Sequence, residues 1–254
     1  MIQSVVLLLL FLSFSAAADA EDSLSIAVAS NFRNTAEEIA DAFTIETGVP
    51  TRLSSGSTGK LYAQIVNGAP YDVFLAADME RPRLLSENGA GIEDTLQAYV
   101  DGELVLMSAD PDIREGNCLR ALRDGSYKRL AIANPATAPY GAAAKAYLQA
   151  AGLWGDAESR IVMGENISQT FQFVATGNAT LGIVSASQLA AGSGRVRTSC
   201  RQAIDAPTDH AVHQGGIILH RSKMHDEARL FMKFLASDTA RAVMIAHGYE
   251  IPGT

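Results

Sequence analysis

Short apolar runs alternate with amphipathic segments along most of the chain. Residues 24–29 form a run of small and branched apolar residues bounded by polar ones, which is typical of a buried parallel strand. Between 35 and 43, apolar residues recur at helical spacing, with acidic residues on the opposite face. The same strand-helix pattern returns over 51–66 and 72–87. Alternation of this kind predicts an open, mostly parallel sheet covered by helices.

A second group of strands and helices follows. Apolar runs predict strands at 104–107, 130–133, 161–163 and 181–184, separated by helical stretches around 119–122, 142–150 and 169–175. Near the end of the chain, 215–219 is predicted to be a strand and 226–235 an amphipathic helix. The number of units fits two α/β lobes, although no Pro/Gly-rich linker divides them.

Composition narrows the class of protein. The 254 residues are 48% hydrophobic and 19% charged, which is the balance of a globular protein and excludes long disordered or coiled-coil regions. A formal net charge of -8 without any Lys/Arg-rich run argues against nucleic acid as a partner. The net charge says less about small anions, because one pocket can carry its own local potential.

The first 20 residues have the pattern of a cleaved signal peptide. An apolar stretch over 5–14 precedes small residues at Ala18 and Ala20, so we expect cleavage before Glu21 and export to the periplasm. A membrane anchor is the alternative, but ten residues span only about 15 Å as a helix, half the thickness of the hydrocarbon layer. We therefore expect a soluble product.

The two cysteines, Cys118 and Cys200, are candidates for a disulfide, because an exported protein folds in an oxidising compartment. Two unrelated buried thiols are the alternative. A bridge would stabilise the protein by roughly 4.5 kcal/mol on the chain-entropy model. In either case we expect these cysteines to have a structural role.

Polar residues stand where the predicted strands end and helices begin. They lie at 30–31, 56–59, 139–141 and 165–168. In open α/β sheets, ligands bind beyond the carboxyl ends of the strands, and free N–H groups at helix starts favour anions there. The alternative is that the Ser, Thr and Asn residues of these segments only cap helices.

The sequence also resembles a known family. The segments 28–32, Val-Ala-Ser-Asn-Phe, and 55–78, which begins Ser-Gly-Ser-Thr-Gly-Lys, resemble the periplasmic molybdate-binding proteins of ABC transporters. Shorter phrases at 133–135, 138–141, 164–167 and 181–184 fit the same family in the same order. The resemblance implies a type II periplasmic binding protein, which has two α/β lobes, each a mostly parallel sheet flanked by helices.

Chain crossings between the lobes are expected near Asp101 and Thr208. The first lobe would then combine 21–100 with 210–254, and the second would contain 101–209. In such proteins the lobes close around the anion.

The resemblance also implies the binding residues. Ser30 and Ser57 would donate hydrogen bonds from side chain and backbone in the first lobe. Tyr140 and Ile167 would donate through their main-chain N–H groups in the second lobe. Asn31 stands beside Ser30, at a position that also serves as a ligand in some members of the family.

One position departs from the family pattern. Members carry a Tyr directly after the Gly-Ile-Val phrase, where its hydroxyl reaches the anion, and this sequence has Ser185 there. A serine side chain is shorter than a tyrosine side chain and reaches less far. The donor at this point is therefore either Ser185 itself or Asn31 in its place. Thr58 is a further candidate in the first lobe.

The candidate residues are hydrogen-bond donors, which suits a fully deprotonated oxyanion. Hydrogen phosphate would need an acceptor for its proton, and only Glu165, if it turned inward, would provide one. The choice of molybdate or tungstate over sulfate follows from the resemblance alone. The same resemblance implies a monomeric receptor that is not an enzyme, holds no cofactor and delivers its anion to an ABC permease in the inner membrane.

Three other functions are weaker alternatives. The segment 56–60 lacks the residues of a P-loop, since Ser54 and Leu61 occupy two of the required positions. A serine hydrolase would need a histidine near Ser30 or Ser57, but all five histidines fall after residue 209 and neither serine lies in a Gly-x-Ser-x-Gly elbow. A metal-cation site would use Asp209, His210 and His213.

Overall fold

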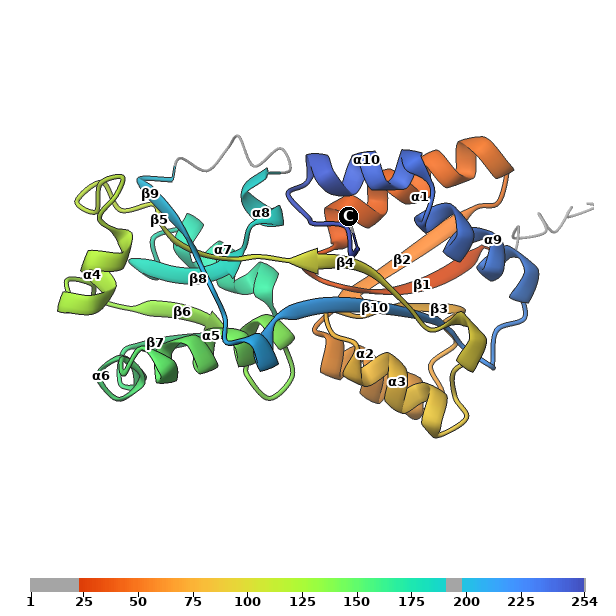
Figure 1. Ribbon diagram of the computed structural model, residues 1–254, viewed down its shortest axis with the longest axis horizontal. Coiled ribbons are helices and arrows are strands. Elements are labelled where there is room, and N and C mark those ends of the chain that lie inside the picture. Colours follow the sequence, from red (N-terminus) through yellow and green to blue (C-terminus); the bar gives the residue numbers. More distant parts are fainter. Residues whose placement is uncertain (1–22, 191–197, 254) are drawn as a thin grey trace, which may run out of the picture.

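The computed structural model of the chain describes residues 23–190 and 198–253 (Figure 1). The predicted signal peptide, 1–20, lies outside these ranges. Within them, no helix is both long enough and apolar enough to cross a membrane.

The first sheet contains five strands. Their order is β2 (Thr51–Gly56), β1 (Leu24–Ala29), β3 (Val73–Leu75), β10 (Val212–Ile218) and β4 (Gln97–Gly102). β1 is parallel to both β2 and β3, whereas β10 is antiparallel to its two neighbours. Four of the five strands therefore run in one direction.

The second sheet repeats this arrangement. Its order is β7 (Ile161–Gly164), β6 (Leu130–Ala133), β8 (Leu181–Ser185), β5 (Leu104–Ser108) and β9 (Cys200–Ile204). β6 is parallel to β7 and β8, and β5 is antiparallel to β8 and β9. In each sheet the reversed strand is the one that enters from the other sheet. The predicted two-lobed α/β fold with mostly parallel sheets is confirmed.

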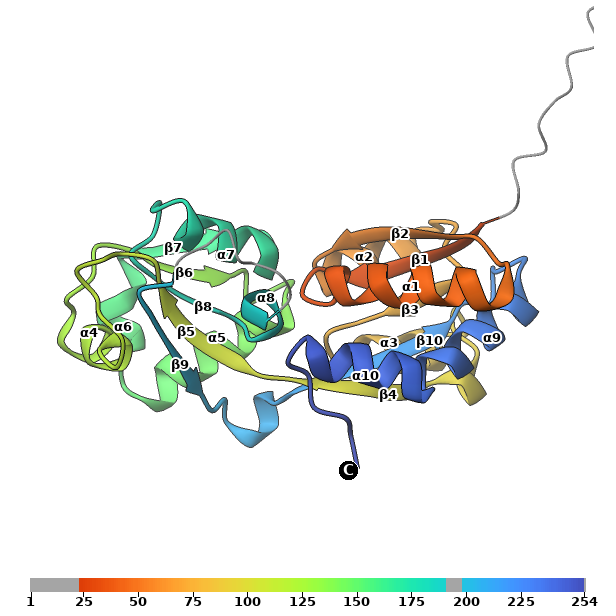
Figure 2. The ribbon, with the colours of Figure 1, turned by 90° about the horizontal axis from the view of Figure 1, so that it is seen from above.

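Helices cover both faces of the first sheet. α1 (Arg33–Thr47), α9 (His225–Leu235) and α10 (Asp238–Ala246) pack against one face, and α2 (Thr58–Val66) and α3 (Glu80–Glu87) against the other (Figures 1 and 2). Alternate residues of β1 enter the two hydrophobic clusters, because successive side chains of a strand point to opposite faces.

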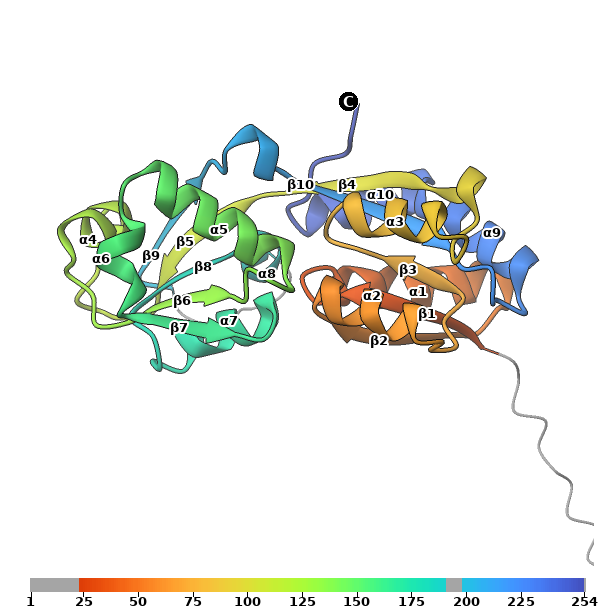
Figure 3. The same cartoon turned by 90° about the horizontal axis from the view of Figure 1, so that it is seen from below.

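The second sheet is covered in the same way. α4 (Cys118–Asp124), α5 (Pro139–Ala150) and α6 (Trp154–Glu158) lie on one face, and α7 (Ile167–Ala175) and α8 (Ser187–Ala190) on the other (Figures 1 and 3). Two short 3-10 helices, η1 (Glu93–Thr95) and η2 (Thr208–His210), complete the elements. Cys118 at the start of α4 and Cys200 at the start of β9 form a disulfide, with their Cα atoms 5.9 Å apart.

The two lobes are joined by two neighbouring connections. β4 passes into β5 with only Glu103 between them, next to the predicted crossing at Asp101, and the segment 205–211 leads from β9 back to β10. The main chain near the C-terminus is bound to the first connection, because Asp101 and Glu250 exchange N–H to O bonds of 2.8 and 3.1 Å. These connections place the ends of the parallel strands of both sheets opposite each other.

Candidate functional site

A small cavity lies between the two lobes. It is lined by residues that follow β1 and β2 in the first lobe and by residues at the starts of α5 and α7 in the second. These lining residues are Ala29, Ser30, Asn31, Gly56, Ser57, Thr58, Ala77, Ala138, Pro139, Tyr140 and Ile167. Its volume is only about 10 Å³, so in this arrangement of the lobes it has room for about one water molecule.

Ser57 is the clearest sign of a ligand site. Ser57 is only 2% exposed and lines the cavity, yet its hydroxyl has no hydrogen-bond partner among the residues that the structure describes. Buried hydroxyls are normally paired, because leaving one unpaired costs about 1 to 3 kcal/mol. Ser57 precedes α2 but makes no capping hydrogen bond, so helix capping does not account for it.

The neighbouring residues fix the start of α2. The hydroxyl of Thr58 accepts a 3.0 Å bond from the main-chain N–H of Ala77, which follows β3. The N–H of Gly59 donates to the main-chain oxygen of Thr137 in the second lobe at 2.8 Å. A Cβ at Gly59 would lie 2.9 Å from that oxygen, so glycine permits this close contact between the lobes.

Ser30 and Asn31 line the cavity from the end of β1. The prediction that Ser30 donates through its main chain is wrong, because its main-chain N–H donates to Gly56 O at 2.9 Å and only its hydroxyl is left for a ligand. The second lobe contacts their main-chain oxygens, with Ser168 donating to Ser30 at 3.0 Å and Ser187 donating to Asn31 at 3.1 Å. The N–H of Asn31 has no protein acceptor within 23–190 and 198–253. Because Asn31 lines the cavity, this N–H is a candidate donor to a ligand.

The side chain of Asn31 was expected to replace the missing tyrosine contact with the anion, but in the structure it is bonded elsewhere. Its amide nitrogen donates to Gln214 Oε1 at 2.9 Å and to the Tyr249 hydroxyl at 3.1 Å. An amide has two hydrogens, so both are already engaged. Asn31 lines the site, but only its main chain has a donor to spare.

Tyr140 and Ile167 supply donors from the starts of α5 and α7. Neither main-chain N–H has a protein acceptor in the described part of the chain, as expected within the first turn of a helix. Asn166 caps α7 by accepting a 3.0 Å bond from Gln169, and Ile167, the first residue of this helix, lines the cavity. The partial positive charge of both helix starts favours an anion.

Ser185 is not among the residues that line the cavity. It is fully buried at the end of β8, with its hydroxyl 3.0 Å from the hydroxyl of Tyr140 and 2.8 Å from that of Ser187. The structure therefore assigns this short side chain to a hydrogen-bonded cluster behind the site. Burial raises the pKa of the Tyr140 hydroxyl well above its ordinary value, so it stays protonated.

No acidic side chain lines the cavity. Glu165, the one carboxylate that sequence placed near it, instead pairs with Lys60 across the lobes at 2.8 Å, and both side chains are about half exposed. The site thus presents N–H and O–H donors without a carboxylate acceptor. Such a set can bind an anion that carries no proton.

The described residues give little support to the other functions. His247 is bonded to Thr35 and Glu38, His213 lies 2.7 Å from Asp101, and no histidine in the described ranges is bonded to Ser30 or Ser57. Those ranges also contain no group of three or more metal-ligating side chains. The side chain of Asp209, one of the three predicted cation ligands, lies outside what the structure describes.

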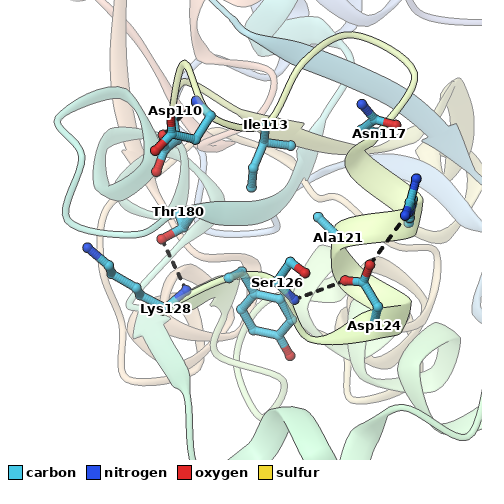
Figure 4. A pocket seen from close by; sticks show the side chains of 11 residues that line it. Asp110, Ile113, Asn117, Ala121, Asp124, Ser126, Lys128 and Thr180 are labelled. Carbon is cyan, nitrogen blue, oxygen red and sulfur yellow. Dashed lines mark hydrogen bonds and ion pairs between the residues drawn. The ribbon is translucent and has the colours of Figure 1, made fainter.

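A larger pocket of about 580 Å³ lies at the outer end of the second lobe (Figure 4). Asp110, Lys128 and Thr180 are among its lining residues. Its polar groups are partly engaged with each other, since Ser126 N–H donates to Asp124 at 3.0 Å and Lys128 N–H to Thr180 at 3.3 Å. All of its lining belongs to one lobe, so binding there would not bridge the two.

An interlobe cavity that is lined by hydrogen-bond donors, in a fold of two α/β lobes, is typical of one class of protein. This class is the solute receptors that close around a ligand. Residues 24–250 match the sequence model of a protein family that is described as bacterial extracellular solute-binding protein. The chain belongs to this family. The resemblance to molybdate-binding proteins is confirmed by two relatives and one solved structure.

The first relative is the molybdate-binding protein ModA of Azotobacter vinelandii, which is 38% identical over 90% of both chains. ModA of Rhodobacter capsulatus is 35% identical over 88% of this chain and 86% of its own. The solved structure of the Azotobacter vinelandii periplasmic molybdate-binding protein matches with a TM-score of 0.83 and 33% identity, and covers 91% of this chain and 100% of that one.

Proposed function

We propose that this protein is a receptor that binds molybdate or tungstate between its lobes and delivers the anion to an ABC permease in the inner membrane. The observation that carries the proposal is the interlobe cavity, whose lining includes the unpartnered buried hydroxyl of Ser57 and two residues, Tyr140 and Ile167, whose main-chain N–H groups have no acceptor among the described residues. The names of the relatives from Azotobacter vinelandii and Rhodobacter capsulatus support molybdate as the ligand.

In the proposed complex every contact is a donor. Ser30 and Ser57 donate through their hydroxyls, and Asn31, Tyr140 and Ile167 through their main-chain N–H groups. Thr58 holds the start of α2, and Ser185 acts only through Tyr140. These five charge-assisted bonds, at roughly 1.5 to 3 kcal/mol each, would together provide about 8 to 15 kcal/mol before the costs of closure. Tight binding thus needs no lysine or arginine in contact.

Closure would be a hinge motion of two units, residues 21–100 with 210–254 and residues 101–209. The adjacent connections at Glu103 and 205–211 support this division, because bending there would separate the two sets of donors. The receptor would be a monomer of the periplasm, released by removal of residues 1–20, and would need neither a cofactor nor a catalytic residue.

A thermal-shift panel tests the proposal. The mature protein is melted with molybdate, tungstate, sulfate, phosphate and chromate in turn. A ligand that binds only the native state stabilises it, by about 2.7 kcal/mol at 100 times its Kd. We expect large shifts with molybdate and tungstate and none with phosphate. A larger shift with sulfate would make the protein a sulfate receptor, and no shift with any oxyanion would remove the proposed function.

A further inference from the structure

A buried hydrogen-bonded cluster spans the two lobes directly behind the cavity. We call it the interlobe cluster, and it contains Asn31, Tyr99, Gln214 and Tyr249 of the first lobe and Tyr140, Ser185 and Ser187 of the second. All seven residues are buried, with relative exposures of 6% or less. Their side chains form hydrogen bonds to each other and to the main chain of Asn31.

Gln214 is the central residue of this cluster. Its side-chain oxygen accepts bonds from Asn31 at 2.9 Å and from Tyr99 at 3.1 Å, and its nitrogen donates to the Tyr140 hydroxyl across the lobes at 3.4 Å. Gln214 stands at a bulge of β10, where the pairing register with β4 shifts. Bulges redirect side chains, and this one directs a polar side chain between the lobes.

Gly102, at the end of β4, makes room for this contact. A Cβ at this position would collide with the Tyr140 hydroxyl and lie 2.8 Å from the side-chain nitrogen of Gln214. The absence of a side chain at Gly102 therefore allows Tyr140 to reach the other lobe. The last residue of the connecting strand β4 and the interlobe bond are thus in direct contact.

Tyr140 has two contacts of different kinds. Its main-chain N–H, at the start of α5 beside the cavity, has no acceptor among the described residues, while its hydroxyl is bonded to Ser185 within its own lobe and to Gln214 in the other. The rest of the ring is buried, at 1% exposure. Tyr140 therefore connects the anion site to the hydrogen bond with Gln214, which can form only when the lobes are together.

We propose that Tyr140 is a positioning residue whose hydroxyl, through Gln214, holds the closed form together and slows release of the anion. This inference rests on the proposed function. The first encounter of the anion with the open lobes does not involve this bond, because Tyr140 and Gln214 lie in different lobes. Loss of the hydroxyl therefore speeds dissociation and leaves association nearly unchanged. It also leaves the amide of Gln214 buried without its partner in the closed form.

The test is Tyr140→Phe, which keeps the ring and the main-chain donor. Stopped-flow measurements with molybdate should give a dissociation rate about tenfold faster, which corresponds to the loss of one hydrogen bond, and an association rate within about twofold of the original. Tyr127→Phe is the matched control, because Tyr127 is a buried tyrosine of the same lobe that lines the outer pocket. We expect it to change neither rate.

A double-mutant cycle with Gln214→Met separates this role from a general loss of packing. If the hydroxyl acts through Gln214, the effect of Tyr140→Phe on release shrinks in the Gln214→Met background. Ser185→Ala is the fallback if Gln214→Met does not fold, and should speed release by a smaller factor. The melting temperature of the empty Tyr140→Phe protein should fall only slightly, because the lost bond to Ser185 lies within one lobe and Ser185 keeps its 2.8 Å bond to Ser187.

The outcomes distinguish the two proposals. Unchanged release from Tyr140→Phe, in a protein whose original form binds molybdate, overturns the role of Tyr140 and leaves the proposed function intact. A slower association at an unchanged dissociation rate also overturns it. If the original protein binds no oxyanion of the panel, the proposed function fails and this inference fails with it.

Discussion

The unpaired hydroxyl of Ser57 gives the sharpest prediction for a single residue. Ser57→Ala removes a proposed donor to the anion, so we expect the affinity for molybdate to fall by about 1.5 to 3 kcal/mol, as for a hydrogen bond to a charged group. The empty protein should melt at the same temperature or slightly higher, because the hydroxyl is buried without a partner among the described residues. Calorimetric titration and melting curves measure the two effects.

Ser199→Ala is the matched control for Ser57→Ala. The Ser199 hydroxyl is also buried and unpaired within the described ranges, but Ser199 precedes β9 and is not part of the cavity lining. Its loss should leave the affinity unchanged. If both variants, or neither, weakened binding, an unpaired hydroxyl would not identify the anion site.

The sequence predicted the lining of the candidate site better than the residues behind it. Ser30, Ser57, Tyr140 and Ile167 all line the cavity, because each stands at a strand end or helix start that a local pattern reveals. Gln214 could not be found in this way. It lies 183 residues from its partner Asn31, on a strand whose apolar pattern gives no sign of a bulge.

At the scale of elements, the start of α7 offers a prediction about capping. The Asn166 side chain accepts a bond from Gln169, and Ser237 caps α10 by accepting one from Ala240 at 3.3 Å. Replacing either cap by Ala should lower the free energy of unfolding by about 1 kcal/mol. Only Asn166→Ala should also weaken molybdate binding, because α7 carries the donor of Ile167.

Denaturant unfolding and titration with molybdate test the pair of caps together. Ser237→Ala acts as the control for a loss of stability far from the anion, since α10 packs against α1 on the outer side of the first sheet. Equal effects of the two variants on affinity would mean that α7 does not position a donor for the ligand.

Sequence analysis missed two strands, β4 and β9, that share a physical feature, and it also missed the helices α6, α8 and α10. β4 and β9 each form one edge of a sheet, with β2 and β7 at the other edges, and the burial of β4 and β9 alternates or is partial. An edge strand is covered less than a central one, so it needs no continuous apolar run. The central strands β1 and β6 were predicted with the bounds that the structure gives them, because both are buried along their whole length.

At the scale of the whole molecule, the two sheets share one strand order although the chain shows no sequence repeat. The reversed strands β5 and β10 follow the two connections, so both connections meet at the middle of the molecule (Figure 2). The outer ends of the lobes are then free of the hinge. Features at an outer end should affect stability and leave ligand binding unchanged.

The disulfide tests this separation between stability and binding. Cys200 pairs with Ser108, at the opposite end of β5 from the residue Leu104 that follows the connection, so the bridge lies at the outer end of the second lobe. It closes a loop with a sequence separation of 82 residues, and on the chain-entropy model its loss costs about 4.5 kcal/mol.

We expect Cys118→Ser with Cys200→Ser to lower the melting temperature of the empty protein, and the affinity for molybdate at 25 °C to stay within about twofold. The shift in melting temperature caused by the anion should therefore persist in the variant, because ligand binding adds to stability independently of the bridge. Loss of affinity in a variant that is still folded would mean that the outer end of the second lobe helps to position the donors of α5 and α7.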